Sequence, residues 1–172
     1  MTPDLFAEPE TVTSSAWISA CGRYRYLLER RWSSKVACVF IMLNPSTADA
    51  TVDDNTIRKC IGYARRWGFG GIVVANLYAY RATDPSELLK VEDPVGPEND
   101  EWIERLVNHP TIVVAWGNDA DEDRVDEFKH LMHAATGWPV DKLLYCMGTN
   151  KNGSPKHPLY LAKGTGLVEW RP

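Results

Sequence analysis

The sequence predicts an α/β fold in which helices cover a mainly parallel sheet. Apolar segments of strand length alternate with helix-length segments that have one apolar face, and this alternation is typical of parallel strands joined by right-handed crossovers. The chain has 172 residues, 44% of them hydrophobic, which suits one domain with a single core. We therefore predict a single α/β domain over residues 21–172, preceded by an N-terminal arm over residues 1–20.

The first part of this domain is predicted to contain an edge strand, two buried strands and one helix. Residues 23–32 mix aromatic, aliphatic and charged side chains in alternation, as in a half-exposed strand. Residues 36–43 (VACVFIML) are almost continuously apolar, which is typical of a central strand covered on both faces. A helix over 56–67 carries its apolar side chains on one face. Three glycines end it, and residues 72–75 (IVVA) form the next buried strand.

The second part of the domain continues the alternation. An Asp-Pro-Ser-Glu sequence predicts a short helix over 85–90, because it combines an N-cap, a proline at the first helical position and a capping-box acid. A helix over 97–108 leads to a strand over 111–116 (TIVVAW). The acidic run that follows begins a helix extending from 119 to 135. A last buried strand over 142–147 precedes a polar loop.

Composition excludes several classes of protein. Asp and Glu total 23 against 19 Lys and Arg, for a formal net charge of -4, so no overall positive field attracts nucleic acid and any polyanion must meet a local patch. No apolar run approaches the about 20 residues that span a bilayer, and no signal peptide begins the chain, so we expect a cytoplasmic protein without membrane contact. The four cysteines lack metal-site spacing, and we expect reduced thiols and no cofactor: Cys21, Cys38, Cys60 and Cys146.

Polar residues collect where the predicted buried strands end, and ligands of parallel sheets bind beyond the carboxyl ends of the strands. The residues after the four strands are, in order, Asn44-Pro45-Ser46-Thr47; Asn76 with Tyr78, Tyr80 and Arg81; Trp116-Gly117-Asn118; and the loop from Asn150 to Tyr160, which contains His157. Asparagine pairs a donor with an acceptor and suits the edge of a nucleobase, on which tyrosine can stack. We therefore predict one polar pocket that binds a nucleotide or a DNA base.

Phosphate contacts would come from basic residues near this pocket. The candidates are Arg58, Arg81, Lys151 and Lys156. Arg58 belongs to the densest positive patch of the chain, on one face of the helix over 56–67. The alternative is a solvated helix face that binds nothing.

The same residue types also have structural explanations. Asparagine is common in turns because its side chain bonds its own backbone. Asp49, Asp53 and Asp54 could form a metal site or an acid pair, but loop solvation and helix capping are favoured. His130 and His133 stand one helical turn apart without the glutamate of a zinc motif, which favours a solvated helix face.

Several segments identify a relationship. The segments that carry the resemblance are MLNPSTADA, DDNTIRKC, ARRWGFGG, NLYAYRATDP, DPVGPEND, WGN and TNKNGSPKHPLY. Through these segments the chain resembles the bacterial and phage family catalogued as domain of unknown function 1643. The resemblance runs from about Tyr24 to the C-terminus, and the family itself implies no activity.

A more distant similarity is to the uracil-DNA glycosylase superfamily. Four motifs of this superfamily have matches in the same order along the chain: Asn44-Pro45, Asn76, Trp116-Gly117 and His157-Pro158. The resemblance implies a three-layer α/β/α sandwich and catalysis without a metal. It also implies that Asn44 positions the attacking water, Asn76 binds the pyrimidine edge, and His157 stabilises the oxygen of the departing base.

The expected function is therefore that of a glycosylase-like enzyme that processes a nucleobase, nucleotide or DNA base at its N-glycosidic bond. In this interpretation Asn44 and His157 are catalytic, and the substrate-binding residues are Pro45, Ser46, Thr47, Asn76, Tyr78, Tyr80, Trp116 and Asn118. Met42 replaces the glycine that the superfamily usually has, and Leu159-Tyr160 replaces Ser-Pro. These departures favour a second hypothesis, a binding module that does not cleave. A third is a protein-binding role for the acidic helix.

Overall fold

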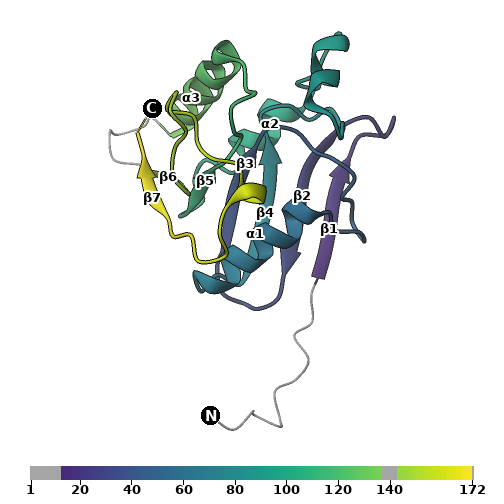
Figure 1. Cartoon of the computed structure of the whole chain (residues 1–172). Helices are drawn as coiled ribbons and strands as arrows, with labels where there is room; N and C mark the ends of the chain where they lie inside the picture. The colour runs from purple at the N-terminus through teal and green to yellow at the C-terminus, as the bar shows by residue number, and fades with distance from the viewer. Residues whose placement is uncertain (1–12, 137–142, 172) are drawn as a thin grey trace, which may run out of the picture.

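The computed structural model describes residues 13–136 and 143–171, and it confirms the α/β fold. Within these residues, seven strands form one mixed sheet in the order β1-β2-β4-β3-β5-β6-β7 (Figure 1). The strands are β1 (Thr13–Ile18), β2 (Arg25–Arg31), β3 (Ala37–Met42), β4 (Gly71–Asn76), β5 (Ile112–Val114), β6 (Leu144–Cys146) and β7 (Val168–Trp170). The helices are α1 (Asn55–Arg66), α2 (Asn99–Glu104) and α3 (Glu122–Thr136), with the 3-10 helices η1 (Pro85–Lys90) and η2 (Pro158–Tyr160).

Parallel pairing is confined to the centre of the sheet. Strands β4, β3, β5 and β6 pair with one another in parallel. The pairs β1–β2, β2–β4 and β6–β7 are antiparallel. The four central strands are those predicted from apolar runs, which suits strands buried on both faces. The sheet as a whole is thus mixed.

Helices pack on both faces of the sheet, because side chains at successive strand positions point to opposite faces. Ile41 of β3 lies in the core cluster that contains Ile103 of α2 and Phe128 of α3. Its neighbour Phe40 lies in the cluster that contains Ile57 of α1. Helix α1 accordingly lies across the front of the sheet in Figure 1. None of the helices in the described part of the chain is long and apolar enough to cross a membrane.

Part of the segment predicted as an N-terminal arm belongs to the sheet. Residues 13–18 (TSSAWI) form β1, which pairs antiparallel with β2 along its length. Trp17 packs against Trp102, with 5.9 Å between ring centroids. Most side chains of β1 stay exposed, so the segment lacks the apolar alternation that identifies a strand in sequence. Residues 1–12 lie outside the described part of the chain.

Other elements differ from prediction in extent. Helix α2 is shorter than the predicted 97–108, and β5 is shorter than 111–116. The short helix over 85–90 has the predicted bounds but is a 3-10 helix, with Asp84 as its N-cap. Strand β7 was not predicted; it closes the other edge of the sheet against β6. Residue 142 of the predicted last strand lies outside the described part.

Candidate functional site

A cleft of 710 Å³ opens at the carboxyl ends of the parallel strands. All four loops that follow these strands contribute to it, as does the N-terminus of α1. The lining residues are Asn44 and Ser46 after β3, Ala82 and Thr83 after β4, Trp116 to Asp119 after β5, Asn150, Lys156, His157 and Leu159 to Leu161 after β6, and Asp54 to Ile57 at the start of α1. The volume is typical of a site for a small organic ligand. The fold therefore gathers four distant loops around one cavity.

Six of the residues predicted for the site line this cleft: Asn44, Ser46, Trp116, Asn118, Lys156 and His157. Seven others are not part of its lining: Pro45, Thr47, Asn76, Tyr78, Tyr80, Arg81 and Lys151. Arg58 lines a second cleft. The candidates immediately after β3, β5 and β6 thus meet, whereas those after β4 do not join them.

Asn44 connects the loop after β3 to the loop after β4. Its Nδ2 donates to the carbonyl of Ala82 at 2.8 Å and to that of Pro45 at 3.1 Å. Both amide hydrogens are thereby used within the protein. Oδ1 accepts no hydrogen bond from the described residues and stays available to a ligand as an acceptor.

Asn76 lies inside the sheet and is 1% exposed. It is the last residue of β4 and pairs in register with Met42. Its backbone carbonyl accepts a hydrogen bond from Asn99 at 3.0 Å. Its side-chain oxygen and nitrogen are buried and have no hydrogen-bond partner among the described residues. Asn76 is not part of the cleft lining.

The segment after β4 carries its tyrosines away from the cleft. The Tyr78 hydroxyl accepts the backbone N–H of Asp121 at 3.3 Å, at the start of α3. Tyr80 packs edge-on against Tyr24, with 6.0 Å between ring centroids. Arg81 donates to the carbonyl of Gly22. These contacts tie the segment to the N-terminal part of the sheet and to α3.

His157 is the residue of the cleft best suited to proton chemistry. It precedes η2, and its Nδ1 accepts the backbone N–H of Leu159 at 3.3 Å. The neutral ring therefore carries its proton on Nε2. Burial lowers the pKa of His157, while the carboxylates of Asp54 and Asp119 act in the opposite direction. The lowered pKa makes neutral imidazole the main form near pH 7.

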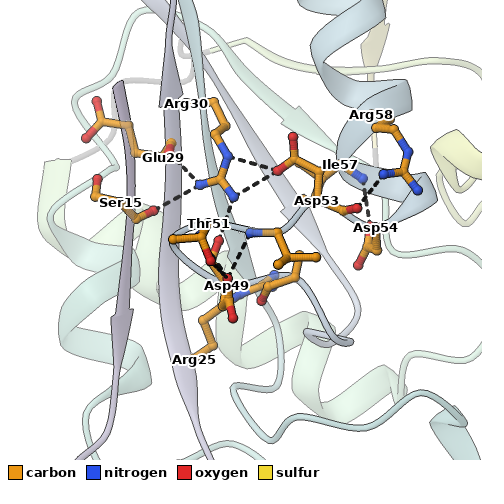
Figure 2. Close-up of polar contacts among 12 residues, drawn as sticks. Ser15, Arg25, Glu29, Arg30, Asp49, Thr51, Asp53, Asp54, Ile57 and Arg58 are labelled. Atoms are coloured by element: carbon orange, nitrogen blue, oxygen red, sulfur yellow. Dashed lines mark hydrogen bonds and ion pairs between the residues drawn. The ribbon is translucent and has the colours of Figure 1, made fainter. Parts of the chain in front are cut away.

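The three aspartates before α1 have separate structural roles (Figure 2). Asp54 is the N-cap of α1 and accepts the backbone N–H of Ile57 at 2.9 Å. Asp53 pairs with Arg30. Asp49 accepts backbone N–H groups within its own turn. Asp54 also lines the cleft, so a capping residue brings a carboxylate to the site.

Arg25 is a cleft residue that the sequence pattern does not reveal. It lines the cleft and is only 2% exposed. Its Nη1 donates to the carbonyl of Ala48 at 2.7 Å. Desolvation by burial lowers the pKa of Arg25 to about 10, so the side chain is still a cation at neutral pH. No signal marks it in the sequence, because charged residues in a half-exposed strand are expected to face solvent.

A second cleft of 640 Å³ runs beside α1. Four basic side chains line it: Arg58, Lys59, Arg66 and Lys163. Arg58 donates to the carbonyl of Asp53 and to Oδ1 of Asn55, and Lys59 donates to the carbonyl of Leu161. Part of this positive patch therefore holds the start of α1 and the C-terminal loop in place.

Comparison with known proteins gives one relationship. The model of a family described as "Protein of unknown function (DUF1643)" matches residues 25–159. Neither the curated proteins nor the solved structures contain a match, so the similarity to uracil-DNA glycosylases stays a prediction. The match covers most of the chain, from Arg25 to Leu159, and both of these residues line the cleft. The chain therefore belongs to the DUF1643 family of proteins of unknown function.

Proposed function

We propose that the protein is a nucleobase-processing enzyme that cleaves an N-glycosidic bond in the cleft, on a three-layer sandwich related to uracil-DNA glycosylases. The observation that carries the proposal is the state of His157. A histidine with a lowered pKa and a proton on Nε2 is a neutral hydrogen-bond donor. Such a donor in a cleft can stabilise negative charge that develops on a departing base.

The reaction requires three groups around the bond between the base nitrogen and the sugar. The electron pair of that bond leaves with the base, whose carbonyl oxygen gains negative charge and accepts from Nε2 of His157. Water adds to the sugar carbon, and Oδ1 of Asn44 orients it by accepting one of its hydrogens. The carboxylates of Asp54 and Asp119 line the cleft and can accept the proton that the water loses.

In this proposal, residues other than Asn76 bind the base. Ser46 and Asn118 contribute polar groups to the cleft, which Trp116 also lines. Oδ1 of Asn118 accepts from Ser154 at 2.7 Å, which leaves its amide hydrogens as donors for a base carbonyl. This assignment replaces the role that the resemblance gave to Asn76.

Release of free base tests the proposal. Purified protein is incubated with oligonucleotides that contain uracil, mismatched or hypermodified bases, and with the corresponding nucleosides and nucleotides. Free base is quantified by chromatography and abasic sites by strand cleavage. We expect His157→Gln to lower release by about a hundredfold or more. His130→Gln is the matched control, because His130 is exposed on α3 and bonds to the backbone of its own helix. Equal release by wild type and His157→Gln contradicts the mechanism.

A binding module without catalysis is the second candidate, and the positions of two asparagines favour it. Asn44 uses both amide hydrogens to join two loops, and Asn76 lies outside the cleft. Two of the three residues expected to carry the chemistry thus have other roles or positions. Ligand binding measured by calorimetry, together with no release of base over hours, identifies the module.

A further inference from the structure

Strand β2 carries two arginines that are equally buried, each 2% exposed. Arg30 is fully paired within the protein. Its Nε and Nη2 contact Asp53, at 2.9 and 2.8 Å, and its nitrogens also donate to three backbone carbonyls, those of Ser15, Glu29 and Asp49. Figure 2 shows this network converging on the Arg30 guanidinium. The side chain therefore has a complete structural explanation.

Arg25 is as buried as Arg30 but has far fewer hydrogen-bond partners. The guanidinium has five N–H groups, and within the described residues it makes one hydrogen bond, from Nη1 to the carbonyl of Ala48. Nε is buried and has no partner among those residues. No carboxylate in the described part of the chain forms an ion pair with Arg25.

The carboxylates of Asp54 and Asp49 attract Arg25 without forming an ion pair with it. A buried cation without an ion-pair partner is unfavourable for folding, because its charge and its buried Nε have lost their water. A buried cation of this kind is typical of a binding site in which a ligand supplies the missing hydrogen-bond acceptors. Arg25 lines the main cleft together with Asn44 and His157, so a ligand in the cleft can reach the free N–H groups. The partner that a guanidinium fork prefers is a carboxylate or a phosphate.

We propose that Arg25 binds the phosphate group of a nucleoside monophosphate in the cleft. This rests on the proposed function for the identity of the base, and it restricts the substrate to mononucleotides. A terminal phosphate offers three oxygens to the unpaired N–H groups of Arg25. Because Arg25 is almost completely buried, only a ligand that enters the cleft as a whole reaches it. A nucleic-acid strand would hold its phosphodiesters at the surface, and the net charge of -4 does not attract it.

Calorimetry with mononucleotides tests this assignment. The probes are deoxyuridine and deoxycytidine 5′-monophosphates, the same two nucleosides without phosphate, and a single-stranded oligonucleotide with unphosphorylated ends. For the wild type we expect each monophosphate to bind about ten- to hundredfold more tightly than its nucleoside, as for a hydrogen bond to a charged group. Equal affinities for monophosphate and nucleoside, or tightest binding by the oligonucleotide, overturn the proposal without need of a variant.

Two matched variants separate ligand binding from structure. Arg25→Met is expected to unfold at the wild-type temperature or above it, since it removes an unpaired buried charge, and to bind monophosphate and nucleoside equally. Arg30→Met is expected to unfold at a lower temperature, because it leaves Asp53 unpaired. If Arg25→Met keeps the preference for monophosphates, or is destabilised as much as Arg30→Met, Arg25 is a structural residue and the assignment is wrong.

Base release measured in the same samples distinguishes this inference from the proposed function. Arg25-dependent binding of monophosphates without release of base supports the phosphate site and contradicts the enzyme. Release of base from oligonucleotides or nucleosides at a rate that Arg25→Met does not change supports the enzyme and contradicts the phosphate site.

Discussion

Arg30 and Asp53 form an ion pair in which one carboxylate oxygen contacts Nε and Nη2 of the guanidinium at 2.9 and 2.8 Å. The arginine belongs to β2 and the aspartate to the loop just before α1. The pair therefore fixes the start of α1 against the sheet, next to Asp54, which caps the helix and lines the main cleft. Arg30 is 2% exposed, so water cannot replace a lost partner.

Asp53→Asn is expected to destabilise the protein. Removing the charge leaves a buried arginine with neutral acceptors only, and hydrogen bonds to charged groups contribute about 1.5–3 kcal/mol. We expect the free energy of unfolding, measured by urea denaturation, to fall by about that amount. Asp126→Asn is the control, because it breaks a solvent-exposed pair with Lys129 one helical turn away and is expected to change nothing measurable. Equal effects of the two substitutions would contradict the structural role of Arg30.

Gly70 and Gly62 are expected to respond oppositely to alanine. A Cβ at Gly70 would lie 2.5 Å from the carbonyl oxygen of Lys35, which belongs to the backbone and cannot move aside. We expect Gly70→Ala to lower the free energy of unfolding by about 1–3 kcal/mol. Gly62 lies in α1, and a Cβ there would have no described atom within 4 Å beyond its own helix backbone, so Gly62→Ala should raise stability by up to about 1 kcal/mol. Thermal unfolding of both variants checks the pair, and a stable Gly70→Ala would disprove the close approach.

Cys21 is expected to be the reactive thiol of the native protein. It is exposed, whereas Cys38, Cys60 and Cys146 are buried. A hydrogen bond with Ser19, followed by contacts with Arg23, lowers the pKa of Cys21 to about 7. Burial raises the pKa of the other three.

One thiol per folded chain should therefore react with Ellman's reagent, at a rate that reaches half its maximum near pH 7. Cys21→Ser should abolish the fast reaction and Cys146→Ser should leave it unchanged. Rapid modification of two or more thiols under native conditions would disagree with the burial of the other cysteines.

The central elements could be predicted because their pattern reflects burial. Strands β3 and β4 are continuous apolar runs covered on both faces, and Asp54 caps α1 at a position that capping rules allow. The edges of the sheet could not be predicted. Strand β1 is held by backbone pairing with mostly exposed side chains, and a backbone ladder leaves no periodicity in the sequence.

The site was predictable only as far as strand ends could be located. Placing Asn44, Trp116 and His157 after parallel strands was sufficient to bring them into one cleft. The same argument failed for Asn76, which is the last residue of β4 and is buried outside the cleft lining. Arg25 could not be found, since its burial depends on strands and loops that are distant in sequence.

The lowered pKa of His157 predicts a pH dependence of stability. The ordinary pKa of histidine is about 6.5, and burial lowers the pKa of His157 in the folded protein. Below pH 6.5 the unfolded chain therefore binds a proton at this residue that the folded protein resists. The free energy of unfolding should fall as the pH drops through about 6.5 toward the folded pKa, and this contribution should be constant above it.

Urea denaturation at about pH 7.5 and at about pH 5.5, on either side of the ordinary pKa of histidine, measures this loss of stability. His157→Gln cannot take up the proton, so it should lose less stability between the two pH values than the wild type does. His130→Gln, which changes an exposed histidine on α3, is the control. An equal loss in wild type and His157→Gln would mean that His157 titrates alike in both states. It would then be largely protonated below about pH 6.5 and could not serve there as the neutral donor that base release requires.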